Sequence, residues 1–199
     1  MTSQIPGAAA GPLAYSSLSG PALEYGNHRL FLAFHQDNEI IVLSSQNGSA
    51  FDTATEIPNL GSSTYVAPML AYRSGKLYLI STDYRQYVNL WVSVNDGVTF
   101  TGPTLLPVSS KGHPALLTFE NEDTKVPELQ LLWSDTANFN DQYRMKIASV
   151  VDGDFSRLVR PHRFEADQAK FSISATRFQG AWWLAWLGTR HQPPERRAL

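Results

Sequence analysis

The chain has 199 residues, of which 43% are hydrophobic, 12% aromatic and 17% charged, a composition typical of a folded globular protein and not of a disordered one. The formal net charge is −2, with 16 Lys and Arg against 18 Asp and Glu, so the chain lacks the basic surface that nucleic-acid binding requires. There is no cysteine, which excludes disulfides, thiolate metal sites and cysteine nucleophiles.

The N-terminal sequence and the apolar runs bear on cellular location. Residues 1–13 have neither a positively charged start nor an apolar core, so we expect no secretory signal peptide. No run of 18 apolar residues predicts a membrane span. A cytoplasmic location is the default expectation, and export by another route stays open.

An internal repeat is the main signal in the sequence. Similar segments begin at Pro21, Pro68 and Pro114, at spacings of 47 and 46 residues, and a fourth copy surrounds residues 181–186. Repeats of this length are typical of architectures in which one supersecondary unit is stacked several times.

Short apolar runs follow one another in the same order within each copy. They are rich in β-branched and aromatic residues, and turn residues separate them, which predicts strands joined by hairpins. No run has the helical spacing of apolar residues over more than two turns. The predicted strands lie at residues 21–23, 29–34 and 39–43, then 68–70, 76–81 and 88–92, then 114–116, 129–133 and 144–148, and finally about 171–178 and 181–187. Each copy is therefore predicted to be a four-stranded antiparallel meander.

The turn after the third strand of each copy carries the most specific motif. Residues 93–100 read Ser-Val-Asn-Asp-Gly-Val-Thr-Phe, residues 44–51 keep the same offsets, and residues 149–155 are one residue shorter. Glycine supplies the positive φ that such a turn needs, and Ser and Asn side chains bond to its backbone amides. We interpret these residues as structural, with the closing aromatic residue packed under the hairpin.

These turns, with the Pro-Ala-Leu openings and the strand at 29–34, resemble the Asp-box (BNR) repeats of sialidase-like proteins over about residues 18–190. The resemblance implies an all-β fold, a β-propeller of four-stranded antiparallel blades. It implies one repeat domain over residues 1–199, with blades at about 18–60, 61–108, 109–165 and 166–190, an N-terminal strand at 11–17 and a tail at 191–199. Since this makes about 3.5–4 blades per chain, we expect a homodimer to complete the ring. A four-bladed monomer and a truncated chain are the alternatives.

Catalysis by a sialidase would require further motifs. The family uses an arginine triad, an Arg-Ile-Pro motif, a Tyr–Glu nucleophile pair and an Asp acid/base. The chain has no Arg-Ile-Pro, and Arg73 and Arg177 do not form a convincing triad with Arg29 or Arg144. The spacing of the acidic residues pairs no two carboxylates for glycoside hydrolysis. We therefore assign no catalytic residue and expect a non-catalytic member of the superfamily.

The loops after the second strand of each copy are the candidate binding elements. They combine polar residues with Tyr or Phe, as suits a carbohydrate, and loops on a rigid scaffold often carry binding residues. The predicted ligand contacts are His35, Asp83, Tyr84, Tyr87, Trp133, Asp135, Trp186 and Arg190. The alternative is that the loops are merely solvated hairpins, and that Trp133 and Trp186 are core residues.

A carbohydrate-binding, lectin-like propeller without turnover is the function that we predict. The five histidines have no ligand spacing, so we expect neither a metal nor another cofactor. The expected partner is a glycan or another small polar ligand, and no nucleic acid. A protein–protein interaction scaffold and a divergent sialidase-type glycosidase are the alternatives.

Overall fold

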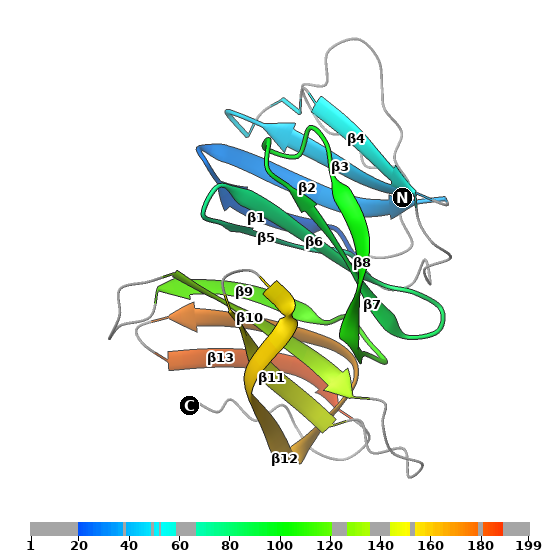
Figure 1. Ribbon diagram of the computed structural model, residues 1–199, viewed down its shortest axis with the longest axis vertical. Helices are drawn as coiled ribbons and strands as arrows, with labels where there is room; N and C mark the ends of the chain where they lie inside the picture. The colour runs from blue at the N-terminus through cyan, green and yellow to red at the C-terminus, as the bar shows by residue number, and fades with distance from the viewer. Residues whose placement is uncertain are drawn as a thin grey trace. The chain divides into compact units, whose positions relative to one another are not determined.

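The computed structural model describes residues 20–37, 39–48, 50–51, 53–58, 67–120, 127–135, 144–151, 154–178 and 181–188. In these ranges the chain forms thirteen β-strands and no helix (Figure 1). None of the described elements is therefore a helix long and apolar enough to cross a membrane. The expectation of an all-β chain is confirmed.

The chain divides into two compact units. The first comprises Met1–Tyr84 and Asn89–Thr104, and the second comprises Arg85–Val88 and Leu105–Leu199. The division passes through two strands of the second sheet, so that sheet contributes residues to both units.

The first sheet is an antiparallel meander of four strands in the order β1-β2-β3-β4. Its strands are β1 (Ala22–Gly26), β2 (Arg29–Gln36), β3 (Glu39–Ser45) and β4 (Thr53–Pro58). A two-residue turn joins β1 to β2, and its residues Asn27 and His28 have φ values of 47° and 58°. Such left-handed pairs match the twist of a tight hairpin.

The second sheet repeats this arrangement in the order β5-β6-β7-β8. Its strands are β5 (Met69–Arg73), β6 (Lys76–Thr82), β7 (Tyr87–Ser93) and β8 (Thr101–Ser109). The β5–β6 turn again has two residues with positive φ, Ser74 at 49° and Gly75 at 78°. The predicted four-stranded antiparallel meander is thus confirmed in two consecutive copies.

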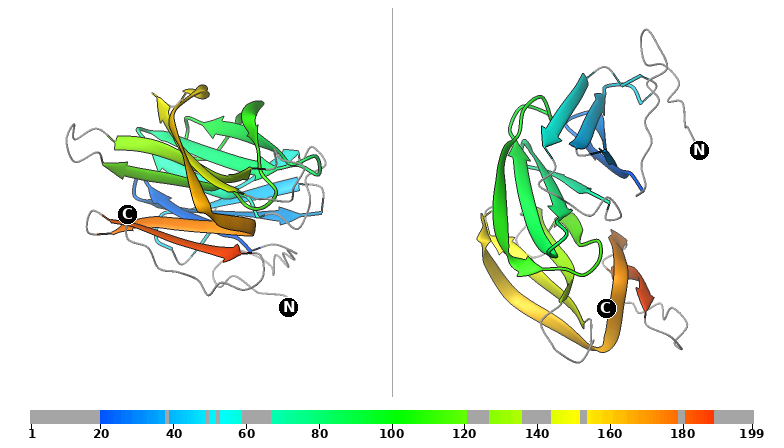
Figure 2. Two further views of the ribbon diagram at one scale, coloured as in Figure 1. Left: turned by 90° about the horizontal axis from the view of Figure 1, so that it is seen from below. Right: turned by 90° about the vertical axis from the view of Figure 1, so that its right-hand side faces the viewer.

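The third sheet has five strands in the order β13-β12-β11-β10-β9. Its strands are β9 (Ala115–Glu120), β10 (Pro127–Asp135), β11 (Arg144–Val151), β12 (Asp154–Phe178) and β13 (Ala181–Gly188). Figure 2 shows β12, coloured yellow to orange, as one long strand that bends along its length.

The continuous β12 differs from the sequence expectation of one strand ending near Val159 and another starting near Phe171. Between Asp154 and Gln168 the strand pairs with β11, and between Ala169 and Phe178 it pairs with β13. Residues 154–178 contain neither Gly nor Asn, the two residues that most readily adopt the positive φ of a tight turn. The chain therefore passes from one partner strand to the next without folding back.

The predicted turn chemistry is present after β7. The Ser93 hydroxyl accepts a hydrogen bond from Gly97 N (2.9 Å), and Asn95 Oδ1 accepts one from Thr99 N (3.0 Å). Gly97 has φ +80°, and Phe100 packs against the core of the first unit. The turn after β3 makes similar bonds, from Gly48 N to Ser45 Oγ (2.9 Å) and from Ala50 N to Asn47 Oδ1 (3.1 Å), but its acceptors lie one position later than the residues aligned with Ser93 and Asn95. The expected bonds from Ser and Asn side chains to turn amides are confirmed in both turns.

The core of the first unit lies between β1–β2 and β5–β6. Phe31 and Tyr72 stack with ring centroids 5.9 Å apart and planes 8° from parallel. Tyr72 N donates a 3.1 Å hydrogen bond to the Glu24 carboxylate, which satisfies a backbone amide on the edge strand β5. Burial raises the pKa of Glu24, and the bond from Tyr72 N lowers it by less. The buried residues of this core are Ala22, Phe31, Ala33, Ile40, Val42, Ile57, Leu70, Leu77, Leu79 and Trp91.

The core of the second unit is built on β10, β11 and β12. Leu132, Met145 and Ile173 are almost completely buried there, and Trp186 packs against them from β13. Trp133 on β10 is only 5% exposed. Large apolar side chains in such positions contribute most of the burial that stabilises a β-sheet protein.

Candidate functional site

Polar residues collect where the second strand of each copy ends. By register, Ala33, Ile80 and Leu132 occupy equivalent places, because they pair with Ala22, Met69 and Ala115. Two residues later come His35, Thr82 and Ser134, whose exposed fractions are 2%, 1% and 0%. The next residues are Gln36, Asp83 and Asp135. Each copy thus places a buried polar side chain and then a more accessible one at the same strand end.

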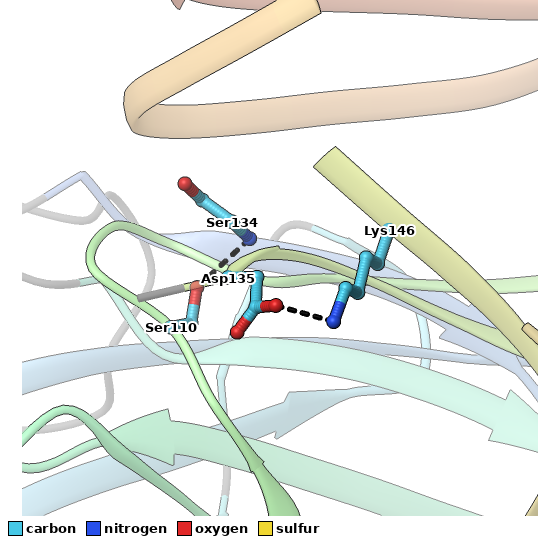
Figure 3. Close-up of polar contacts among 4 residues, drawn as sticks. All are labelled: Ser110, Ser134, Asp135 and Lys146. Atoms are coloured by element: carbon cyan, nitrogen blue, oxygen red, sulfur yellow. Dashed lines mark hydrogen bonds and ion pairs between the residues drawn. The ribbon is translucent and has the colours of Figure 1, made fainter. Parts of the chain in front are cut away.

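In the second unit, Ser110 lies in the loop between β8 and β9 and connects that loop to the end of β10 (Figure 3). Its hydroxyl donates to Gly112 O (3.0 Å) and accepts a hydrogen bond from Ser134 N (3.3 Å). Its backbone N donates to Gln86 O (2.8 Å), and Lys111 N donates to Ser134 O (3.1 Å). Ser110 and Ser134 are both fully buried, so this network fixes the backbone from which Asp135 projects.

Asp135 and Lys146 form an ion pair beside this network (Figure 3). In the β10–β11 register, Lys146 lies opposite Trp133, so its ammonium group reaches Asp135 along the diagonal of the hairpin. The side chains keep 14% (Asp135) and 31% (Lys146) of their surface exposed. The pair therefore offers a charged acceptor and a charged donor side by side at a partly accessible position.

The corresponding strand end in the first unit is more deeply buried. His35 Nε2 lies 3.3 Å from Ser81 Oγ, and this contact joins β2 to β6. Among the described residues, Thr82 Oγ1 and Gln36 Oε1 are buried without a hydrogen-bond partner. Unsatisfied buried oxygens are uncommon in native proteins and mark places where a polar group can still be accommodated.

The predicted site residues divide between the two units. His35, Asp83 and Tyr84 belong to the first unit, where His35 is buried and Tyr84 is 62% exposed. Tyr87, which is 45% exposed, belongs to the second unit together with Trp133, Asp135 and Trp186. Arg190 lies outside the described residues. Their role in ligand binding stays a prediction, and the core alternative for the tryptophans agrees with the burial of Trp133 and the packing of Trp186.

Sequence reasoning did not find Ser110 or Lys146. Ser110 lies between two copies of the repeat, and its contacts depend on tertiary structure that the sequence pattern does not reveal. Lys146 could have been found from hairpin pairing, since it is opposite Trp133, but that pairing requires the register across a long loop.

Metal binding receives no support from the part of the chain that the structure describes. No three His, Cys, Asp or Glu side chains within those residues come together in a way that could hold an ion. The chemistry available at the strand ends is therefore hydrogen bonding and charge, with nearby aromatic rings.

Comparison with known proteins finds similar solved structures but no matching family model or curated protein. No protein-family model matches the chain, and no curated protein matches it. Solved structures do match. The fold is that of a β-propeller. The chain forms part of one, and similar structures are GH43 glycosidases with a five-bladed β-propeller fold.

Three of these similar structures illustrate the likeness. GH43B of a Bacteroides ovatus xyloglucan locus matches with a TM-score of 0.61 at 12% identity, over 94% of this chain and 42% of its own. An exo-β-1,3-galactanase from Phanerochaete chrysosporium matches with a TM-score of 0.62 at 12% identity, over 94% of this chain and 47% of its own. A GH43 β-1,3-galactosidase with galactodeoxynojirimycin matches with a TM-score of 0.63 at 10% identity, over 94% and 73%. The chain thus spans less than half the length of the first two.

The outcome for the expected family follows from these matches. The β-propeller fold is supported, and membership of the sialidase-like, Asp-box family is not shown. Identities of 10–12% carry the fold alone, because one fold supports many activities.

Proposed function

We propose that this chain is the glycan-recognising part of a carbohydrate-active β-propeller, with Asp135 and Lys146 as its central polar contacts. The names of the similar structures refer to xyloglucan, β-1,3-galactan and β-1,3-galactoside, which supports a sugar as the ligand. The observation that carries the proposal is the partly exposed Asp135–Lys146 pair on a backbone fixed by Ser110 and Ser134.

The charged pair is suited to a neutral sugar with neighbouring hydroxyl groups. A carboxylate only accepts hydrogen bonds, an ammonium group only donates them, and a hydroxyl group does both. One sugar hydroxyl can therefore donate to Asp135 while its neighbour accepts from Lys146. Because the two charges compensate each other, the position favours uncharged sugars over acidic ones.

An aromatic residue follows a member of this network along the chain. Gln86 O accepts the hydrogen bond from Ser110 N, and the next residue, Tyr87, is 45% exposed. An exposed ring can stack on the apolar face of a sugar while the charged pair bonds the hydroxyls, which is the mixture of contacts that fixes polar ligands in protein sites.

Calorimetric titration with galacto-, xylo- and arabino-oligosaccharides tests this proposal. We expect Asp135→Asn and Lys146→Met each to weaken binding at least about tenfold, because each removes a hydrogen bond to a charged group. Lys76→Met is the matched control, since Lys76 is an exposed residue of the first unit at the other end of its strand, and it should bind as the wild type does. Binding that neither site variant changes would refute the site.

Hydrolysis of the bound glycan is the second candidate function, and the similar structures favour it over lectin-like binding without turnover. Its specific support is that Asp135 is a partly exposed carboxylate at a strand end, and that the similar structures named above are glycosidases. Glycosidases use two carboxyl groups, one as acid and one as base or nucleophile.

Release of aryl alcohol from aryl β-galactosides, β-xylosides and α-arabinofuranosides tests the hydrolytic function. We expect Asp135→Asn to abolish turnover even at substrate concentrations well above those that saturate the wild type, and Lys76→Met to leave turnover unchanged. A wild-type protein that binds an oligosaccharide but turns over none of these substrates would refute hydrolysis and restore the lectin-like interpretation.

A further inference from the structure

One face of the β1–β2 hairpin presents apolar side chains to solvent. Leu23 is 63% and Tyr25 64% exposed, and their cross-strand partners Leu32 and Leu30 are half-buried. These four residues are called the β1 face below. Large apolar side chains grouped on one sheet face are a feature of interaction surfaces.

The second sheet carries the same four residue types at the same register positions. Leu70 pairs with Leu79 and Tyr72 with Leu77, as Leu23 pairs with Leu32 and Tyr25 with Leu30. In the second sheet this face is covered, because the three leucines are 0–3% exposed and Tyr72 packs against the core of the first unit. The β1 face is therefore an uncovered copy of a surface whose packing partner is known.

That packing partner is the other face of β2. Tyr72 stacks on Phe31, the fully buried Ala33 lies two residues further along, and Glu24 accepts the hydrogen bond from Tyr72 N. The partner surface thus combines an aromatic ring, a small residue that permits close approach, and a side-chain acceptor for an edge amide.

The β12–β13 hairpin repeats this partner surface in exposed form. Its closing pair Phe178–Ala181 corresponds to the pair Gly26–Arg29 of the first hairpin. Two and four residues after Ala181, Trp183 and Ala185 take the places of Phe31 and Ala33. Two residues before Phe178, Thr176 takes the place of the acceptor Glu24. All three residues are exposed, Trp183 by 40%. They are called the β13 face below.

We propose that the β1 face of one copy of this chain docks on the β13 face of a second copy. Tyr25 then stacks on Trp183, the leucines cover Ala185, and the Thr176 hydroxyl accepts a hydrogen bond from Tyr25 N. Because the contact joins unlike faces, one such contact leaves a β13 face on the first copy and a β1 face on the second. The proposal is independent of glycan binding.

One position departs from the pattern, since Phe178 stands in the register where the first hairpin has Gly26.

Sedimentation velocity of the full chain over a wide concentration range tests the proposal. We expect the wild type to self-associate, and Tyr25→Asp and Trp183→Asp each to raise the dissociation constant at least about tenfold, since both place a charge at the centre of an apolar contact. Val94→Asp, at a 72% exposed turn position outside both faces, should self-associate as the wild type does. Far-ultraviolet circular dichroism confirms that each variant is folded.

Mixing the two variants gives a result that no general loss of stability can produce. Tyr25→Asp retains an intact β13 face and Trp183→Asp an intact β1 face, so the mixture should form a one-to-one dimer although each variant alone is monomeric. A wild type that is monomeric at all concentrations would overturn the proposal, because a second copy would then not cover the two faces. A mixture that stays monomeric would also overturn it.

Discussion

Gly26 is the glycine at which the structure allows least change. A Cβ at this position would lie 2.1 and 2.2 Å from Cγ and Cδ1 of Tyr72, and 2.5 Å from its Cβ. These atoms are at the base of the ring, so rotating the side chain does not relieve the overlap. Gly26→Ala must therefore push β5 away from β1 or turn the Tyr72 ring off Phe31.

The expected cost combines two effects. Overpacking in a closely packed contact costs about 1–3 kcal/mol, and loss of an aromatic stack costs a further 0.5–1.5 kcal/mol or so. We expect Gly26→Ala to lower the free energy of unfolding by about 2–4 kcal/mol and the Tm by roughly 4–16 °C for a chain of this size. Urea denaturation followed by tryptophan fluorescence measures the change.

Two further variants isolate the cause. Gly20→Ala is the matched control, because an added Cβ there meets no atom within 4 Å, and it should change stability little. In a Tyr72→Ala background the two nearest atoms are gone, so Gly26→Ala should cost at least about 1 kcal/mol less than in the wild type. An equal cost in both backgrounds would refute the steric reasoning.

Four further substitutions test other parts of the structure. Burial raises the pKa of Glu24, so the folded state holds this proton more tightly, and the resulting stability is lost as pH rises through the folded pKa. Glu24→Gln keeps an acceptor for Tyr72 N, so it should remove this pH dependence and exceed wild-type stability near about pH 7 in urea titrations; parallel profiles would contradict this. Asn95→Ala loses the bond from Thr99 N and should cost about 1 kcal/mol in the same assay, and an unchanged midpoint would argue against a role for this bond. Thr82→Val removes a buried hydroxyl that has no hydrogen-bond partner, so it should leave the free energy of unfolding unchanged or raise it. Ser110→Ala leaves Ser134 N without its acceptor and should lower the free energy of unfolding by about 1–3 kcal/mol. A larger loss of stability for Thr82→Val than for Ser110→Ala would contradict these assignments.

The sequence predicted those features that depend on neighbours along the chain. Alternating apolar runs and turn residues placed the strands of the first two sheets, and the Ser and Asn positions predicted the bonds in the turn at Gly97. Hairpin pairing is local, so a repeated hairpin pattern is enough to predict a repeated sheet. The same local reasoning required a break within β12, where the chain instead continues from pairing with β11 to pairing with β13.

The candidate site was predicted only in part. Asp135 was found, since a polar residue at a strand end is visible in the repeat, but its partner Lys146 and the bridging Ser110 were not. These contacts connect a loop between two copies to the ends of a hairpin, and their geometry follows from packing that no local pattern encodes. The assignment of Trp133 as a ligand contact likewise had a core alternative, with which its burial agrees.

The unbroken β12 also bears on how this protein can vary in length. Residues 83–86 connect β6 to β7, and Tyr84 and Arg85 are exposed there, so this loop should tolerate insertions. No loop separates the part of β12 that pairs with β11 from the part that pairs with β13. A single residue inserted between Ile173 and Phe178, where the pairing with β13 has no register shift, would turn Ile173 from the core to solvent and bring its polar neighbours inward. Related sequences should therefore vary in length at residues 84–85 and keep a constant length from Ile173 to Phe178, and domain-insertion libraries should show the same contrast.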